Sequence, residues 1–215
     1  MVLIPLFCQP WIDNIMTQIS PLAPSNFPDL PNIDGVRFAS AAAGVKYPNR
    51  TDVMLASLAP GATIAGVFTR SATRAASVLD CQDKIGGDMS KGAAILVNSG
   101  NANAFTGGMG KASVDRICSA VAAQLNIPAE AVFTSSTGVI GEVLPDQKIM
   151  DCLEQLTASL SSAALEEAAR AIMTTDTFPK GASRTLQING RPVTISGFAK
   201  GSGMIAPDMA TMLVY

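Results

Sequence analysis

The stretch Ala93–Gly107, AAILVNSGNANAFTG, decides the fold that we expect for this chain. Its first part, Ala93–Asn98, is an apolar run with no alternation of polar residues, which predicts a strand buried on both faces. Glycine and asparagine follow at once, and they predict a tight loop at the end of that strand. A loop in this position is where a functional site would be expected.

Strand and helix patterns alternate on both sides of this run. Apolar segments bounded by turn residues predict further strands at 35–42, 52–58, 63–69 and 131–135. Asn189-Gly190 predicts a tight hairpin turn between strands at 185–188 and 192–198. Apolar residues at helical spacing predict helices at 72–79, 114–125, from 145 to about 160, and 162–173. We therefore expect an α+β fold, a layered mixed sheet with helices, rather than a doubly wound parallel sheet.

The composition describes a globular chain with a substantial core. Of 215 residues, 48% are hydrophobic and 15% are charged, which excludes a disordered class. The formal net charge is −2 and there is no basic run, so neither nucleic acid nor an anionic membrane is the expected partner. The cysteines show no CxxC pair and are expected to be small buried residues in a reducing compartment: Cys8, Cys81, Cys118 and Cys152.

The chain contains no histidine. This removes the usual general base, the Ser-His and Cys-His nucleophile pairs and most zinc sites, and no metal site is expected. If the protein is a hydrolase or a transferase, another group must accept the proton of the nucleophile.

The N-terminal residues 1–28 are expected to form a loosely ordered leader. They lack the features of a signal or transit peptide, because the first basic residue is Arg37 and Pro5 and Pro10 interrupt the apolar run. No run approaches the length of a membrane helix. The expected location is the cytoplasm.

Two glycine-bearing loops fail as nucleotide-binding motifs. The loop 98–111 does not match a phosphate-binding loop, because Phe105 takes the place of the first glycine and Ala112 follows Lys111. The segment Gly201–Ala206 formally matches a dinucleotide motif. Such a motif needs a long helix next and an acidic residue about 20 positions on, whereas here Pro207 follows and the sequence ends at Tyr215. We interpret the first as a tight loop after a buried strand, and the glycines of the second as letting the backbone pass close to another group.

A third loop, Thr134–Gly141, is a strand that ends in hydroxyl groups and glycine. Such a turn commonly bonds only its own backbone. In the functional interpretation, Thr137 and the amide of Gly138 direct donors to one spot, as an oxyanion hole requires.

Two later segments, TTDTFPK at 174–180 and KGSGMIAPDMATML at 200–213, look ordinary when each is taken alone. Together with NSGNANAFTG at 98–107 and SSTGVIG at 135–141, they occur in one order. This set resembles the ornithine acetyltransferase family, whose members are bifunctional glutamate N-acetyltransferases and amino-acid acetyltransferases. The resemblance extends from about Pro21 to Tyr215, and it is specific because four separate motifs agree.

The resemblance implies a precursor that cuts its own backbone between Ala210 and Thr211. Residues 29–210 would then be the α-chain domain and 211–215 the start of a β chain. It also implies a fold similar to that of the self-processing DmpA-type aminopeptidases, incomplete without the β chain. The implied assembly is an αβ heterodimer that pairs into α2β2.

The implied reaction is transfer of acetyl from N-acetylornithine to glutamate in arginine biosynthesis, with an acyl-threonine intermediate on Thr211. No bound cofactor is implied, although some members also take acetyl from acetyl-CoA. Thr137 and Gly138 match the oxyanion-hole positions. Thr174, Lys200 and Thr211 match substrate-binding positions, with Thr177 as the alternative to Thr174.

The chemistry of a terminal threonine fits a chain without histidine. Attack of the Thr211 hydroxyl on the Ala210 carbonyl gives an ester that water opens, and the freed α-amine has a reference pKa of about 7.7–8.0. That amine can accept the proton of the hydroxyl near neutral pH.

Two alternatives stay open at this point. One is a DmpA-like N-terminal-nucleophile aminopeptidase, and the other is an inactive fragment that only pairs with a β chain. The sequence extends only five residues past Ala210, from Thr211 to Tyr215, so the isolated chain is expected to be inactive and to expose apolar surface where a β chain would pack.

Overall fold

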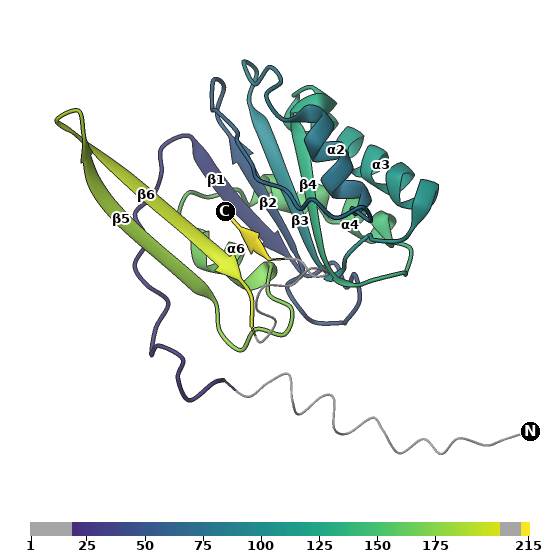
Figure 1. The fold of residues 1–215 in the computed structure, drawn as a ribbon, viewed down its shortest axis with the longest axis horizontal. Coiled ribbons are helices and arrows are strands. Elements are labelled where there is room, and N and C mark those ends of the chain that lie inside the picture. The colour runs from purple at the N-terminus through teal and green to yellow at the C-terminus, as the bar shows by residue number, and fades with distance from the viewer. Residues whose placement is uncertain (1–18, 203–211) are drawn as a thin grey trace, which may run out of the picture.

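The computed structural model describes residues 19–202 and 212–215 of the chain. Its elements form two sheets. Sheet A has four strands in the order β1-β2-β3-β4, and sheet B has three in the order β5-β6-β7. Figure 1 shows the two sheets side by side, with helices packed against sheet A. The expected α+β class, a layered mixed sheet with helices, is confirmed.

Sheet A is built around the strand that the sequence singled out. β3 (Ala93–Asn101) lies between β2 (Val53–Leu58), which is antiparallel to it, and β4 (Val132–Val139), which is parallel. β1 (Val36–Ala41) pairs with the outer edge of β2. The predicted strands at 35–42, 52–58, 93–98 and 131–135 are confirmed. β3 and β4 both extend past their predicted ends into the polar motifs.

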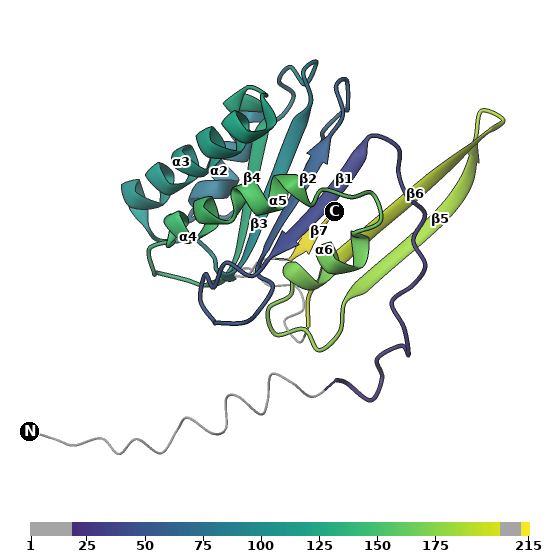
Figure 2. The same ribbon diagram turned by 180° about the vertical axis from the view of Figure 1, so that it is seen from behind.

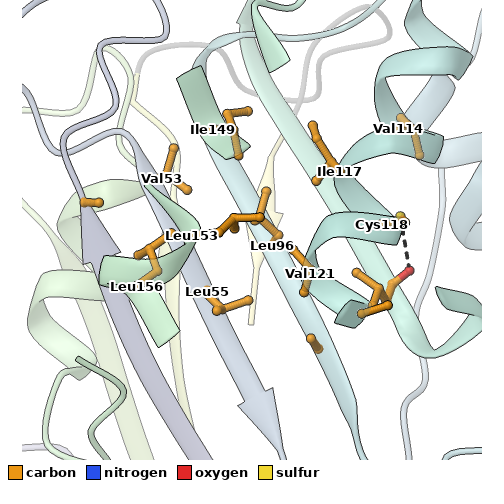
Figure 3. Close-up of a cluster of buried hydrophobic side chains, with 14 of the residues drawn as sticks. Val53, Leu55, Leu96, Val114, Ile117, Cys118, Val121, Ile149, Leu153 and Leu156 are labelled. Carbon is orange, nitrogen blue, oxygen red and sulfur yellow. Dashed lines mark hydrogen bonds between the residues drawn. The ribbon is translucent and has the colours of Figure 1, made fainter. Parts of the chain in front are cut away.

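One face of sheet A is covered by α3 (Gly107–Leu125), α4 (Asp146–Asp151) and α5 (Leu153–Ala158). Figure 3 shows this core, in which Leu55 and Leu96 of the sheet meet Ile117, Val121 and Leu156 of the helices. The helix predicted from 145 to about 160 is two helices with a break at Cys152, although the predicted apolar face is buried as expected. A short 3-10 turn, η1 (Ala129–Ala131), leads into β4.

The other face of sheet A packs against α6 (Leu165–Ala171) and the base of sheet B. Met54 and Val97 of the sheet meet Ile172, which follows α6, and Phe198 of sheet B, and all four residues are buried. The helix predicted at 162–173 is confirmed with shorter bounds. Figure 2 shows α6 at the base of the hairpin.

α2 (Ala76–Lys84) lies along the free edge of β4. Cys81 Sγ contacts the Thr134 carbonyl oxygen at 3.2 Å, and Lys84 Nζ donates to the Val132 carbonyl oxygen at 3.1 Å. These contacts satisfy backbone acceptors that an edge strand otherwise leaves open. The helix predicted at 72–79 is therefore present, but it begins and ends later.

Sheet B consists mainly of the hairpin that Asn189-Gly190 predicted. β5 (Lys180–Ile188) pairs with β6 (Arg191–Lys200) along its whole length, and both turn residues have positive φ, 51° and 75°. The hairpin is longer than expected because its strands extend back to Lys180 and on to Lys200. β7 (Leu213–Val214) adds two residues to the other edge of β6.

The prediction of a strand at 63–69 was wrong, since that segment does not pair with any strand of the described residues. Ile64 and Phe68 do pack against the cluster that contains Phe133, while Val67 is fully exposed. Two of the apolar residues of this segment are thus partly buried. Among the described residues, no strand pairs with this backbone, and α2 contacts the β4 edge of sheet A.

The part of the leader that the structure describes, residues 19–28, contains neither helix nor strand. Phe27 packs against the cluster that contains Phe198. The proposed domain boundaries at 28 and 210 stay predictions. None of the helices in the described residues is long and apolar enough to cross a membrane.

Candidate active site at the strand ends

The carboxyl ends of β3 and β4 bring two of the predicted motifs together. Ser99 pairs with Thr137 and Gly100 with Gly138 in the parallel ladder. Thr137 is buried, whereas Gly138 is exposed at the strand end. The two predicted oxyanion residues therefore lie where a loop meets a buried strand, with an accessible backbone at Gly138.

Gly138 needs the absence of a side chain. Its φ of 133° is in the region that L-residues rarely adopt, and a Cβ there would lie 2.6 Å from the Asn101 backbone nitrogen and closer still to Gly100. β4 can approach β3 this closely only because residue 138 is glycine, while a Cβ on Gly100 would instead meet Lys46. The motifs NSGNANAFTG and SSTGVIG thus form one unit at the ends of two strands.

The loop after β3 is held by its own asparagine side chains. Asn98 Nδ2 donates to the Asn101 carbonyl at 2.9 Å, and Asn101 Oδ1 accepts from the Asn103 N–H at 2.7 Å. Asn103 Nδ2 in turn donates to the Gly110 carbonyl, and Ser136 Oγ donates to Asn98 Oδ1 at 2.7 Å. These bonds use the polar groups of the loop internally, in agreement with the interpretation as a tight turn.

Ser99 joins this unit to the segment that leads into the TTDTFPK motif. Its hydroxyl donates to the Ala171 carbonyl, at the end of α6, at 2.8 Å. Arg50, in the loop between β1 and β2, donates to the carbonyl oxygens of Met173 and, at 3.1 Å, of Thr174. The start of the motif therefore lies beside the ends of β3 and β4, although more than 30 residues separate them in the chain.

Lys200 and Thr174 meet at the end of β6. Lys200 Nζ lies 3.4 Å from Thr174 Oγ1, and only 6% of the Lys200 surface is exposed. Burial lowers the pKa of Lys200 below its ordinary value, and the nearby charge of Asp176 partly opposes that shift. Such a desolvated ammonium group is suited to holding a carboxylate, because its interactions are weakly screened by water.

Asp176 is a central residue that the sequence analysis did not single out. Its carboxylate accepts from the Gly201 N–H at 2.7 Å, from Lys180 Nζ at 2.8 Å and from the Thr174 N–H at 3.2 Å. Burial alone would raise the pKa of Asp176, but these hydrogen bonds outweigh it and hold the pKa below the ordinary value. Asp176 thereby ties the TTDTFPK motif to the residue that follows Lys200.

The loop between β1 and β2 packs against the end of β3 next to this site, and the gap between them is too narrow to admit a water molecule. Its lining is polar and consists of Lys46, Tyr47, Arg50, Asp52, Ser99 and Gly100. Asp52 shapes the loop by accepting the Ala43 and Val45 N–H groups at 2.8 Å and 2.6 Å. Burial raises the pKa of Asp52, although those hydrogen bonds oppose the shift.

Other predicted residues fall outside this cluster. Ala210 and Thr211, the expected cleavage pair, lie outside the described residues, and so does most of the 201–206 segment. Thr177 is half-buried in the same motif as Thr174. Within the described residues, no group of three or more Cys, Asp or Glu side chains gathers in a way that could hold a metal ion.

The three cysteines that the structure describes are free thiols. Burial raises the pKa of Cys81, Cys118 and Cys152 to about 11 in each case. A thiol with such a pKa is a poor nucleophile, so none of the three is a candidate catalytic residue.

Fold and site together define a class of protein: an α+β chain whose strand ends gather hydroxyl groups, paired glycines and a buried lysine around one spot. The profile of the ArgJ family matches residues 37–215, and the chain belongs to that family. The specific resemblance inferred from the four motifs is thus confirmed.

Individual relatives agree with the family assignment. The arginine biosynthesis bifunctional protein ArgJ of Ruegeria pomeroyi is 66% identical over 93% of this chain, and that of Agrobacterium fabrum is 49% identical over 92%. The aligned part is 49% and 47% of those relatives, so the chain spans about half the length of the curated relatives it matches.

Two solved structures share the fold. One is the arginine biosynthesis bifunctional protein ArgJ from Bacillus halodurans, with a TM-score of 0.73 and 34% identity over 84% of this chain and 92% of that chain. The other is ornithine acetyltransferase from Mycobacterium tuberculosis in complex with ornithine, with a TM-score of 0.73 and 36% identity over 84% of this chain and 93% of that chain.

Proposed function

We propose that the chain is the N-terminal part of an acetyltransferase that moves acetyl from N-acetylornithine to glutamate in the cytoplasm. The observation that carries this proposal is the cluster at the strand ends. Thr137 and Gly138 pair with Ser99 and Gly100 of β3, and Ser99 bonds the Ala171 carbonyl, three residues before Thr174. Thr174 in turn contacts the buried Lys200. The resemblance assigns the oxyanion hole to Thr137 and Gly138, and substrate binding to Thr174 and Lys200.

In the proposed reaction, the precursor first breaks its backbone before Thr211. The Thr211 hydroxyl attacks the Ala210 carbonyl carbon, the peptide nitrogen leaves as the new α-amine, and water then hydrolyses the ester. This yields one chain that ends at Ala210 and another that begins with Thr211. The new amine supplies the base that a chain without histidine otherwise lacks.

Acetyl transfer then uses the same hydroxyl. The α-amine of Thr211 takes the hydroxyl proton as the oxygen attacks the acetyl carbonyl of N-acetylornithine. The C–N bond breaks, ornithine leaves with a proton on its amine, and the acetyl group stays on Thr211 as an ester. The amine of glutamate attacks that ester and regenerates the hydroxyl. We include acetyl-CoA as a second donor that could load the same oxygen.

Lys200 has a separate role in this scheme. Both proposed substrates carry a carboxylate, and an ammonium group with 6% of its surface exposed binds such a group with little competition from water. Thr174 Oγ1 fixes the direction of Lys200 through their 3.4 Å contact. Lys200 is thus expected to affect the KM for both substrates.

The lengths of the relatives support a product of two chains. The aligned region covers only 49% of the Ruegeria relative, but it covers 92% and 93% of the chains in the two solved structures. A chain that corresponds to the N-terminal half is what cleavage near Thr211 would release. On this proposal, the 215 residues alone lack transferase activity.

The proposal is tested in the full-length precursor with acetylornithine and glutamate as substrates. Thr137→Ala removes one oxyanion donor and is expected to raise the barrier by about 2.7–4 kcal/mol, seen as a lower kcat. Unchanged turnover would remove Thr137 from the mechanism. Hydrolysis of a peptide amide in place of acetyl transfer would instead favour the DmpA-like aminopeptidase.

A second variant separates binding from chemistry. Lys200→Met should raise KM at least tenfold, because the substrate carboxylate loses the buried ammonium group that binds it. Lys91→Met, in the exposed turn before β3, serves as the matched control. A Lys200→Met enzyme with the KM of the control would contradict the carboxylate role.

A further inference from the structure

Lys200 is a buried lysine that forms no ion pair with any of the described residues. Its Nζ contacts the neutral hydroxyl of Thr174 at 3.4 Å, and β7 places the apolar Leu213 opposite it in the sheet. A buried ammonium group without a carboxylate in contact tends to lose its proton or to turn toward water. Another group must therefore keep Lys200 charged and in place.

Asp176 anchors Lys200 from two sides. One carboxylate oxygen, Oδ1, accepts the Gly201 N–H at 2.7 Å and so holds the backbone directly after Lys200. The other, Oδ2, accepts the N–H of Thr174 at 3.2 Å, and Thr174 is the residue that the ammonium group touches. These contacts close a ring around Lys200. Only 1% of the Asp176 side chain is exposed, so water competes little with the ring.

The charge of Asp176 acts on Lys200 without an ion pair between them. Burial lowers the pKa of Lys200, and the Asp176 charge opposes that shift. The other described charged groups at this ring are Lys180, whose Nζ lies 2.8 Å from Asp176 Oδ1, and Arg50, which donates to the Thr174 carbonyl oxygen. Asp176 therefore favours the charged form of Lys200 while no described carboxylate occupies its ammonium group.

We propose that Asp176 is the positioning residue that holds the Lys200 ammonium group, charged and correctly directed, for the carboxylate of the acetyl donor. The inference rests on the transferase function proposed above. It separates the roles of the ring: Lys200 contacts the substrate, Thr174 directs Lys200, and Asp176 acts on both without contacting the substrate. Lys180 has no part in binding, although it forms the ion pair with Asp176.

The test compares N-acetylornithine with its carboxamide as acetyl donors for the processed full-length enzyme. The two compounds differ only in the carboxylate, because the α-amine is acetylated in both. The ratio of their kcat/KM values therefore cancels the steps at Thr211 and measures how well Lys200 binds the carboxylate. The unaltered enzyme should prefer the acid about tenfold or more at pH 7. This preference should disappear as the pH rises and Lys200 loses its proton.

Asp176→Asn keeps the size of the side chain and removes its charge. The preference for the acid should fall about threefold or more at pH 7. It should also disappear at a lower pH than in the unaltered enzyme, because Lys200 then releases its proton more readily. Asp176→Glu keeps the charge and should restore that pH. Lower stability alone affects both compounds equally, so a ratio that is unchanged at every pH overturns the proposal.

A second variant is expected to act in the opposite direction and does not require Asp176→Asn to fold. Lys180→Met frees the Asp176 charge from its ion pair, so the preference for the acid should persist to a higher pH. If the ion pair merely holds this region together, Lys180→Met should weaken the preference instead, and that result overturns the proposal. Asp88→Asn, which alters an exposed carboxylate, is the control and should keep the unaltered ratio.

The positioning role and the proposed function can fail separately. An enzyme that prefers the acid, loses the preference with Lys200→Met and keeps it with Asp176→Asn contradicts the positioning role alone. An unaltered enzyme that transfers acetyl from neither compound contradicts the proposed function, and the positioning role falls with it.

Discussion

Sheet A and the hairpin of sheet B are both regular ladders, yet they are stabilised in different ways. β2 and β3 are buried on both faces, with Leu55 and Leu96 on one side and Met54 and Val97 on the other. The outer half of the hairpin has no core on either side. Sheet A therefore depends on packing, while the hairpin depends on its turn and its cross-strand pairs. The candidate site lies where the packed region meets the base of the exposed one.

The largest expected contrast is between two glycines with positive φ. Gly138→Ala places a methyl group against the backbone of β3 and should cost more than about 4 kcal/mol in the free energy of unfolding, because two buried strands must separate. Gly190→Ala at the hairpin turn meets nothing within 4 Å, and only its backbone strain of about 1–2 kcal/mol remains. Denaturant unfolding of both variants checks the contrast. Equal losses would show that the two sheets are stabilised alike.

A smaller contrast is expected between two leucines. Leu55 is fully buried, so Leu55→Ala should lower the free energy of unfolding by about 3 kcal/mol through lost burial and the cavity left behind. Leu186 is 42% exposed on the hairpin of sheet B, and Leu186→Ala should cost about 0.5 kcal/mol in the free energy of unfolding. If Leu186→Ala proves as costly as Leu55→Ala, the hairpin depends on packing as sheet A does.

The junction between the two regions should depend on pH through Asp176. Its pKa is held below 3.8, so the unfolded state binds the proton more readily, and the stability it provides is lost as the pH falls from 3.8 through the folded pKa. Asp176→Asn should lower the free energy of unfolding by about 2 kcal/mol at pH 7. It should also reduce the loss of stability that occurs as the pH falls below 3.8. Thermal unfolding from pH 7 to pH 2 measures both effects.

A matched control for that measurement is Asp88→Asn. The pKa of Asp88 is also lowered, through hydrogen bonds from Ser90, but its carboxylate is fully exposed. Solvent screens such an interaction, so the Asp88→Asn variant should lose stability at acid pH in the same way as the unaltered chain. An Asp176→Asn variant that behaves like this control would show that Asp176 does not hold the junction together.

Much of the fold could be predicted because its signals are local. The run Ala93–Asn98 identified the central strand, and Asn189-Gly190 identified the hairpin, since both patterns reflect the geometry of a few neighbouring residues. The strand predicted at 63–69 failed because a strand also needs a partner, and partners come from tertiary structure. The helix from 145 to 160 was predicted as one because its apolar face is continuous across the break at Cys152.

In the candidate site, too, the residues with local sequence motifs could be predicted, and those that depend on tertiary contacts could not. The motifs containing Thr137, Gly138, Thr174 and Lys200 were found in the sequence, and the structure brings these residues to one end of the sheets. Arg50 could not be found, because its contact with the Thr174 carbonyl spans 124 residues and an isolated arginine carries no local signal. Asp176 had a weak signal as an acidic residue within a quoted motif. Its role depends on the Gly201 N–H, which only the fold brings near.

The most direct test of the proposed function is intact mass spectrometry of the full-length precursor before and after incubation with N-acetylornithine. We expect two polypeptides, one ending at Ala210 and one beginning at Thr211, with a single acetyl group on the second after incubation and its loss when glutamate is added. An uncut polypeptide that transfers acetyl groups at full rate would contradict the account.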